Sequence, residues 1–300
     1  MLIQSLKIFC DLTNSQSFSK TAILNSVTQS AVSQQIKSIE RRQGKPLVER
    51  KNRIISLTPE GEVFYRSARD IVQRYVDMQT GIESLDGIIS GTVRLSTIYS
   101  VGMLEIASHL KVYLKAYPRV NFRLQYDQAM KIYEDVANSE VDLGIVAYPK
   151  AQKNIEVLPF SHDEMVVICH SENPLANRDS LNIGDLDQYP LILFSPETPT
   201  RQTLESFFLK EGLHPRIVME LDHIDTIKHA VEADLGIAIV PAPSIEPELQ
   251  EGQLKALTLE GKTLVRPLGI LYRKNRNLSK AAQKLIEVFQ TESALKSEAA

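Results

Sequence analysis

The chain has 300 residues, of which 43% are hydrophobic and 24% are charged, and its formal net charge is −3 at pH 7. These values are ordinary for a soluble globular protein with real cores, and the length favours two or three domains. No apolar run approaches the length of a membrane span, which excludes a membrane-spanning class.

The cysteines and the N-terminus bear on the compartment. Cys10 and Cys169 are the only cysteines, and each lies in an apolar segment, so we expect both to pack as small hydrophobic side chains without a disulfide. Gln4, Lys7 and Asp11 interrupt the first turns, so we expect no signal peptide. Both observations favour the cytoplasm. The six histidines show no spacing typical of metal ligands, and we predict no metal and no cofactor.

Residues 17–40 have the pattern of a helix, a tight turn and a second helix. Thr28 is a good N-cap for the second helix, and Val32, Ile36 and Ile39 form an apolar stripe at helical spacing. A polar set that we assign to DNA contact lies on its other faces: Thr28, Gln29, Ser30, Ser33, Gln34 and Lys37. Gln can recognise adenine edges in the major groove and Ser can bond either base type, although an ordinary surface helix would show the same pattern.

A basic segment follows this helix. Residues 47–57 have the pattern of two short strands around a basic turn, a wing whose Arg50 and Arg53 can contact phosphate. Residues 1–60 contain nine Lys or Arg and four Asp or Glu, a net charge of +5. Because the whole chain is −3, residues 61–300 carry −8, and this asymmetry favours double-stranded DNA as a partner at one end of the chain only.

Together these segments resemble the LysR-type transcriptional regulators. The resemblance is carried by Phe18, Ala22, Val27, 30–36, Ile39, Glu40, Gly44, 46–50 and 57–61, and it continues along nearly the whole chain. Thr21 and Asn25 depart from the family pattern, which usually has Ala and Leu at these positions. We expect Leu24 to supply the missing core contact.

The resemblance implies an α+β, multidomain protein with an N-terminal winged helix-turn-helix, a long linker helix and a C-terminal α/β, periplasmic-binding-protein-like domain of two subdomains. It implies a transcriptional regulator, modulated by a small-molecule effector, that binds promoter or operator DNA and RNA polymerase as a homodimer or homotetramer, without a membrane partner. The predicted domains are 1–58 for DNA binding, 59–88 for the linker and 89–300 for effector binding, divided into subdomain I (89–162 plus 267–300) and subdomain II (163–266).

A long helix is predicted to begin near Pro59 and to run to about residue 85. Its apolar residues alternate steps of four and three and form a heptad seam: Phe64, Ala68, Ile71, Tyr75, Met78, Ile82 and Leu85. We interpret the seam as a dimer contact that presents two recognition helices to a two-fold related DNA site, and a helix packed on its own domain is the alternative. Asp86-Gly87 and Ser90-Gly91 are predicted to form the hinge.

From residue 91 strands and helices alternate. Strands are expected at 92–97, 120–126, 141–147, 165–169, 191–194, 216–220, 236–240 and 265–273, and helices at 102–116, 130–137, 201–210, 226–233 and 279–292. The segments 141–149 and 233–241 resemble each other, since each passes from a helix through Asp-Leu-Gly into a core strand. This repetition favours two similar halves, and the strand at 265–273 would return to the first half.

Two helix starts, at 97–102 and 195–201, are expected at the cleft between these halves, because open α/β sheets bind ligands at the carboxyl ends of their strands. Their free amides favour an anion, and Arg201 can pair with a carboxylate or sulfate. Glu197 makes the second start less positive, which disfavours a dianion and leaves a zwitterion or a neutral metabolite open. With the positions that the family resemblance implies, the candidate effector site is Thr97, Tyr99, Ser100, Gln128, Tyr148, Thr200 and Arg201. In the alternative, Ser100 and Thr200 are N-caps and Arg201 is a surface charge.

Two other functions fit the sequence less well. An enzyme built on the α/β body would need a catalytic motif, and the GxSxG, HExxH, Walker A and GxGxxG patterns do not occur. A solute-binding protein for transport would need an export signal and would not need a basic DNA-binding domain. We therefore predict a regulator that is not an enzyme.

Overall fold

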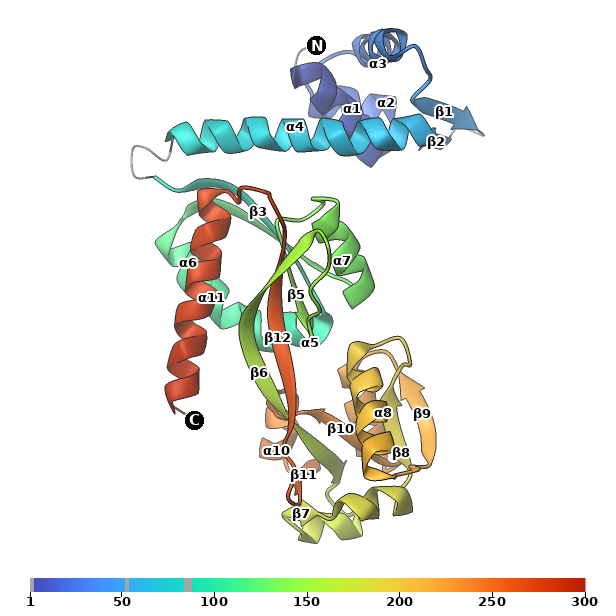
Figure 1. Cartoon of the computed structure of the whole chain (residues 1–300), viewed down its shortest axis with the longest axis vertical. Helices are drawn as coiled ribbons and strands as arrows, with labels where there is room; N and C mark the ends of the chain where they lie inside the picture. Colours follow the sequence, from blue (N-terminus) through green and yellow to red (C-terminus); the bar gives the residue numbers. More distant parts are fainter. Residues whose placement is uncertain (1–2, 52–53, 84–87, 300) are drawn as a thin grey trace. The chain divides into compact units, whose positions relative to one another are not determined.

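The computed structural model describes residues 3–51, 54–83 and 88–299, and the chain divides into two compact units, Met1–Ile89 and Ser90–Ala300 (Figure 1). The predicted hinge residues Asp86 and Gly87 lie outside the described residues, as does Leu85 of the seam. Ser90 and Gly91 belong to a strand that pairs with its neighbour, so this part of the predicted hinge lies at the very start of the second unit, directly after the boundary between the units.

The first unit is a bundle of helices with one two-stranded sheet. Its elements are α1 (Ile3–Ser15), α2 (Phe18–Leu24), α3 (Gln29–Gln43), β1 (Val48–Lys51), β2 (Ile54–Leu57) and α4 (Pro59–Glu83). The stripe predicted for the second helix is buried, because Val32, Ile36 and Ile39 pack with Phe9 and Leu12 of α1. The amphipathic pattern of α3 thus turns its polar face away from the core.

Polar contacts occupy the two positions that depart from the family pattern. Thr21 is fully buried, and its hydroxyl donates to a backbone carbonyl one turn earlier at 2.8 Å. The Asn25 Nδ2 donates to Asp11 Oδ2 at 2.7 Å, and its Oδ1 accepts from Lys7 Nζ at 3.0 Å. Leu24 is 62% exposed, so the expectation that it fills the core is wrong. Hydrogen bonds hold the first helix pair where an apolar contact was expected.

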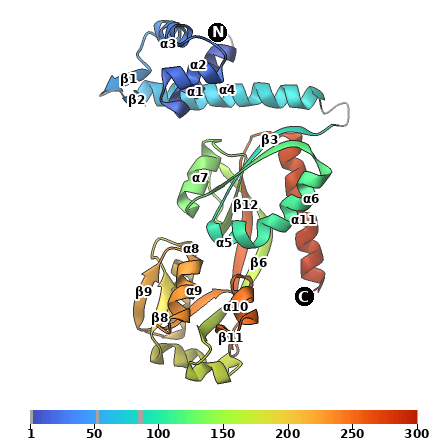
Figure 2. The same cartoon turned by 180° about the vertical axis from the view of Figure 1, so that it is seen from behind.

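The second unit is one mixed sheet with helices packed against it (Figures 1 and 2). Its strands are β3 (Ser90–Thr97), β4 (Arg119–Tyr126), β5 (Leu143–Ala147), β6 (Ile155–His170), β7 (Ser180–Leu181), β8 (Leu191–Phe194), β9 (Ile217–Leu221), β10 (Ile237–Pro241), β11 (Leu254–Leu259) and β12 (Leu264–Arg273). Its α-helices are α5 (Tyr99–Val101), α6 (Ala107–Ala116), α7 (Ala129–Ala137), α8 (Pro199–Glu211), α9 (Ile224–Glu232), α10 (Glu246–Gln250) and α11 (Lys280–Ala299). A π-helix, Gly102–Ile106, joins α5 to α6.

Two central strands, β12 and β6, join the half that contains β3, β4 and β5 to the half that contains β8, β9 and β10. The sheet order is β4-β3-β5-β12-β6-β10-β8-β9, and β6 pairs with β12 over most of its length before it pairs with β10 (Figure 1). The sequence predicted only residues 165–169 of β6, because the preceding Ser161, His162 and Asp163 interrupt the apolar pattern. The prediction that the last strand returns to the first half is confirmed, since β12 pairs with β5.

The described ranges hold neither a membrane span nor a metal cluster. No helix there combines the length and the apolar character that crossing a bilayer requires. Within the same ranges no group of three or more His, Cys, Asp or Glu side chains is arranged to hold a metal ion.

Candidate DNA-binding and effector-binding sites

The α3 helix begins and ends through local capping. The Thr28 Oγ1 accepts from the amide of Ala31 at 3.2 Å, and Gly44 ends the helix in the left-handed conformation with φ 70°. The residues predicted at the DNA interface are all exposed apart from Ser33, which is half-buried: Thr28, Gln29, Ser30, Ser33, Gln34 and Lys37. One helix therefore combines a buried apolar stripe with a solvent-facing row of amide, hydroxyl and ammonium groups.

The wing forms as predicted in outline. Strands β1 and β2 pair antiparallel from Val48 opposite Leu57 to Lys51 opposite Ile54. Arg53 lies outside the described residues, and only the backbone of Arg50 is described. The phosphate contacts expected of these two side chains therefore stay predictions.

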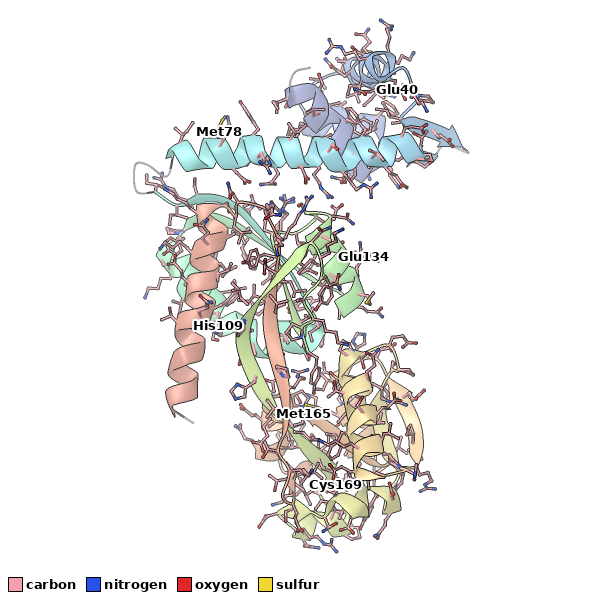
Figure 3. The ribbon with its side chains drawn as sticks, in the orientation of Figure 1. Glu40, Met78, His109, Glu134, Met165 and Cys169 are labelled. Atoms are coloured by element: carbon pink, nitrogen blue, oxygen red, sulfur yellow. The ribbon has the colours of Figure 1, made fainter. Side chains whose placement is uncertain are left out.

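The predicted seam along α4 divides into two parts. Phe64 packs edge-on against Phe9 of α1, with ring centroids 4.9 Å apart, and Ala68 is buried beside the same helix. For these two residues the intermolecular interpretation is wrong, because α1 of the same chain covers them. The next members of the seam are each at least 39% exposed: Ile71, Tyr75, Met78 and Ile82 (Met78 is labelled in Figure 3).

The first half of the predicted effector site gathers at the carboxyl ends of three neighbouring strands. Thr97 ends β3, Gln128 follows β4 and Tyr148 follows β5. Tyr148 has a positive φ of 49°, which is uncommon for a residue with a side chain, and its amide donates to Pro267 O at 2.8 Å. Burial raises the pKa of the Tyr148 hydroxyl above its ordinary value. These loops place hydroxyl and amide groups at one edge of the sheet.

A buried ion pair lies beside this group. Arg266 of β12 and Asp163 of β6 are opposite each other in the ladder, and both side chains are 2% exposed. The guanidinium Nε donates to Asp163 Oδ2 at 2.8 Å, and Nη1 donates to Ser100 Oγ at 3.1 Å. Because the Ser100 oxygen accepts this bond, its own hydroxyl hydrogen is left to donate elsewhere. The pair thereby links the strands shared by both halves to the start of α5.

Arg201 has a different role from the one expected. Its Nε donates to Glu205 Oε1 at 2.7 Å, and its Nη1 donates to Glu220 Oε1 at 2.8 Å and to Phe194 O at 2.9 Å. Its side chain is 5% exposed. The expectation of a free bidentate anion binder is therefore wrong for this structure, as is the alternative of a surface charge.

The N-cap of α8 also differs from the expectation. Thr198, not Thr200, caps the helix, and its Oγ1 accepts from the Arg201 amide at 3.2 Å. Thr200 lies buried in the first turn. At the other predicted start, Ile98 and not Ser100 is the N-cap residue of α5. The alternative in which Thr200 and Ser100 act as caps is therefore wrong.

Aromatic rings join the two halves. Tyr99 of α5 lies 5.6 Å from the ring of Tyr126 and 5.7 Å from the ring of His223, the residue before α9. Gly102 lies beside them, where a Cβ would meet Tyr126 Cε1 at 2.2 Å. The carboxyl ends of the strands in the two halves thus meet at the Tyr99–His223 contact.

Two family models match the chain. The model for the bacterial regulatory helix-turn-helix protein of the lysR family matches residues 3–62, and the LysR substrate binding domain matches residues 87–294, more than half of the chain. The chain belongs to the LysR family of transcriptional regulators. It is a DNA-binding regulator of transcription with a C-terminal effector-binding domain.

Individual relatives agree with this membership. The regulator is 30% identical over 285 residues to the HTH-type transcriptional activator CmpR of Synechocystis sp., a match that covers 95% of this chain and 93% of CmpR. A full-length OxyR from Pseudomonas aeruginosa has the same fold, with a TM-score of 0.77 at 20% identity over 96% of this chain and 93% of OxyR. The effector binding domain of QuiR in complex with shikimate has a TM-score of 0.63 at 25% identity over 68% of this chain and 98% of the QuiR chain.

Sequence reasoning about this regulator missed Arg266, Asp163 and His223. The sequence did contain a signal for Arg266, because it lies inside the otherwise apolar strand β12. A charged residue in such a strand is rarely buried without a partner. The partner itself was not visible, since it lies 103 positions earlier in the chain. His223 had no local signal, because its contact with Tyr99 depends on the arrangement of the two halves.

Proposed function

We propose that the polar face of α3 enters the major groove of double-stranded DNA, with Thr28, Gln29, Ser30, Ser33, Gln34 and Lys37 at the interface and Arg50 and Arg53 on phosphates. The observation that carries this proposal is that α3 buries its apolar stripe in its own core and keeps this polar set at the surface. A helix anchored in this way presents amide and hydroxyl groups to base edges without rearrangement.

The regulator is proposed to dimerise through the exposed part of α4. The supporting feature is the row of apolar side chains at steps of four and three that α1 leaves uncovered: Ile71, Tyr75, Met78 and Ile82. A dimer, alone or paired into a tetramer, would place two α3 helices on half-sites one or more helical turns apart.

The effector site is proposed to lie at the strand ends that meet near Tyr99. It comprises Thr97, Tyr99, Ser100, Gln128, Tyr148 and Thr200, with Arg266 behind Ser100 and Arg201 supporting the second half from within. Both guanidinium groups already face carboxylates, Arg266 with Asp163 and Arg201 with two glutamates. A neutral or singly charged hydroxylated molecule therefore suits the site better than a dianion.

In the proposed mechanism the effector changes the geometry between the two halves, because it contacts Ser100 and through it the strands that both halves share. It can act only through different affinities for the two arrangements. The resulting change in the spacing of the α3 helices would alter DNA binding and contact with RNA polymerase at the promoter. We place this activity in the cytoplasm, where the DNA partner is, and propose that binding is the whole function. Turnover that survives deletion of residues 1–58 would contradict the last point.

Selection of bound duplexes from a random pool tests the DNA part. The full-length protein should enrich a two-fold related motif, and the Gln34→Ala variant should lose preference at one position of each half-site. Enrichment of no motif by a folded, dimeric protein would refute sequence-specific binding through α3.

Thermal unfolding of the full-length protein against a panel of small metabolites tests the effector part. A reporter dye is needed because the chain has no Trp. The panel includes shikimate, the ligand in the QuiR structure, together with amino acids and inorganic anions. A ligand at a hundredfold its dissociation constant stabilises by about 2.7 kcal/mol, a shift of several degrees. The shift should shrink in Ser100→Ala, and a shift that is unaffected there would place the ligand elsewhere.

A further inference from the structure

Glu40 connects the recognition helix to the wing. It lies near the end of α3 (Figure 3), and its Oε1 accepts from the amides of Leu47 at 2.9 Å and Val48 at 3.2 Å. Val48 is the first residue of β1 and pairs with Leu57, so these two amides stand at the base of the wing. One carboxylate oxygen therefore joins α3 directly to the point where the wing begins.

A carboxylate is unfavourable at this position unless it has such partners. The C-terminal turns of a helix carry partial negative charge, and there α3 also carries Arg41 and Arg42, as the helix dipole favours. The same helix is proposed to enter the major groove, where the negative charge of the DNA repels Glu40 as well. The hydrogen bonds from the two amides offset both effects. This indicates that Glu40 serves the geometry of the interface and not its charge.

The other side of the wing base is fixed by α4. The Leu47 carbonyl accepts from the Thr58 amide at 3.1 Å, and the Thr58 hydroxyl donates to Pro46 O at 2.9 Å while it accepts from the Gly61 amide at 2.9 Å. A Cβ on Gly61 would lie 2.0 Å from Leu47 O, so only glycine permits this approach. On the α3 side, Glu40 accepts hydrogen bonds from the Leu47 and Val48 amides.

We propose that Glu40 is a positioning residue of the DNA interface, which sets the angle between α3 and the wing so that both reach the DNA at once. The inference rests on the proposed DNA contacts of α3 and of the wing. In the proposed interface Glu40 itself touches no base or phosphate. Its loss should therefore remove the contribution of the wing and leave that of α3.

Two substitutions separate geometry from charge. Glu40→Gln keeps an acceptor oxygen at the same reach but removes the charge, whereas Glu40→Asp keeps the charge but withdraws the oxygen by one methylene. Binding of each full-length variant to a fluorescein-labelled duplex of mixed sequence is measured by anisotropy across a KCl series. Glu62→Gln, an exposed carboxylate in the first turn of α4, is the matched control for charge. Arg53→Ala reports separately whether the wing touches phosphate.

Glu40→Asp should bind more weakly, and its salt slope should fall by about one for each phosphate that the wing no longer reaches. Glu40→Gln and Glu62→Gln should bind at least as tightly as the wild type with an unchanged slope. A Glu40→Asp protein that binds like the wild type overturns the inference, as does a folded Glu40→Gln protein with a reduced slope. If the Asp variant fails to fold, a reduced slope in Glu40→Gln still overturns the inference. An unchanged slope in Arg53→Ala would instead refute the wing contact on which the inference rests.

Discussion

The starts of α3 and α8 are locally alike, but they leave different side chains available to a ligand. Each begins with a threonine whose hydroxyl accepts from the amide three residues later, Thr28 from Ala31 and Thr198 from Arg201, both at 3.2 Å. In α3 the polar side chains of the first turn are exposed. In α8 the Arg201 side chain is buried and bonded to two glutamates and a carbonyl. Residue type and capping are the same kind of signal in both, and only the surroundings decide which side chains remain for a ligand.

The largest effect is expected where polar groups are most deeply enclosed. Asp163→Leu leaves the Arg266 guanidinium buried without its carboxylate, and loss of one partner of a buried pair should lower the free energy of unfolding by roughly 3–5 kcal/mol. Urea unfolding of the full-length protein, followed by circular dichroism, measures this in the transition of the second unit.

A double variant separates the effect of the unpaired buried charge from the effect of altered side-chain packing. Asp163→Leu with Arg266→Met replaces the pair by apolar groups of similar size and should recover most of the lost stability. If the double variant is as unstable as the single one, the pair is not the source of the effect.

A smaller loss is expected for Arg201→Met. The partners Glu205 and Glu220 are about half exposed and stay hydrated when Arg201 is removed, so we expect destabilisation of roughly 1.5–3 kcal/mol. Ligand-induced thermal shifts should survive, because Arg201 is proposed to support the fold and not to touch the ligand. If Arg201→Met is as stable as the wild type but shows no ligand-induced thermal shift, Arg201 contacts the effector. The starts of α3 and α8 would then both present side chains to a ligand.

Gln34→Ala sharpens the α3 side of the comparison. The exposed Gln34 makes no contribution to the core, so unfolding should be unaffected, while binding to the selected operator should weaken by about 1–3 kcal/mol. Anisotropy titrations on the operator and on a scrambled duplex measure the difference. Equal losses on both duplexes would identify Gln34 as a phosphate contact and not a base contact.

The smallest effect is expected at the thiols. Burial raises the pKa of Cys10 to about 12 and that of Cys169 to about 11, from an ordinary value of 9.0. Since a raised pKa means that the unfolded state loses the proton first, the stability that the neutral thiols contribute is complete below pH 9.0 and declines as the pH rises toward these values. At neutral pH, iodoacetamide should label the native protein far more slowly than the urea-unfolded protein. Rapid native labelling would mean that a thiol is accessible.

The sequence predicted best those features that depend on neighbours in the chain. The limits of α3, its cap at Thr28 and its buried stripe follow from residues within one or two turns of each other. The roles of Arg201 and Arg266 did not, because Glu220 and Asp163 lie on other strands and only the folded sheet brings them together. The length of β6 was underestimated for the same reason, since its polar middle is stabilised by pairing with β12. The packing of α1 on Phe64 and Ala68 of the seam is likewise a tertiary contact, which the heptad pattern alone does not reveal.

The long ladder between β6 and β12 limits where the chain can accept insertions and deletions. The two strands pair from Ile155 opposite Arg273 to Met165 opposite Leu264, with one shift in register near Leu268. Slipping by one residue would turn every following side chain to the opposite face of the sheet and separate Arg266 from Asp163. The pairing of β6 with β12 therefore resists sliding of one strand along the other. A single deletion in either strand should be far more harmful than one in a surface loop, so insertions and deletions in functional variants should fall in the connections between the elements.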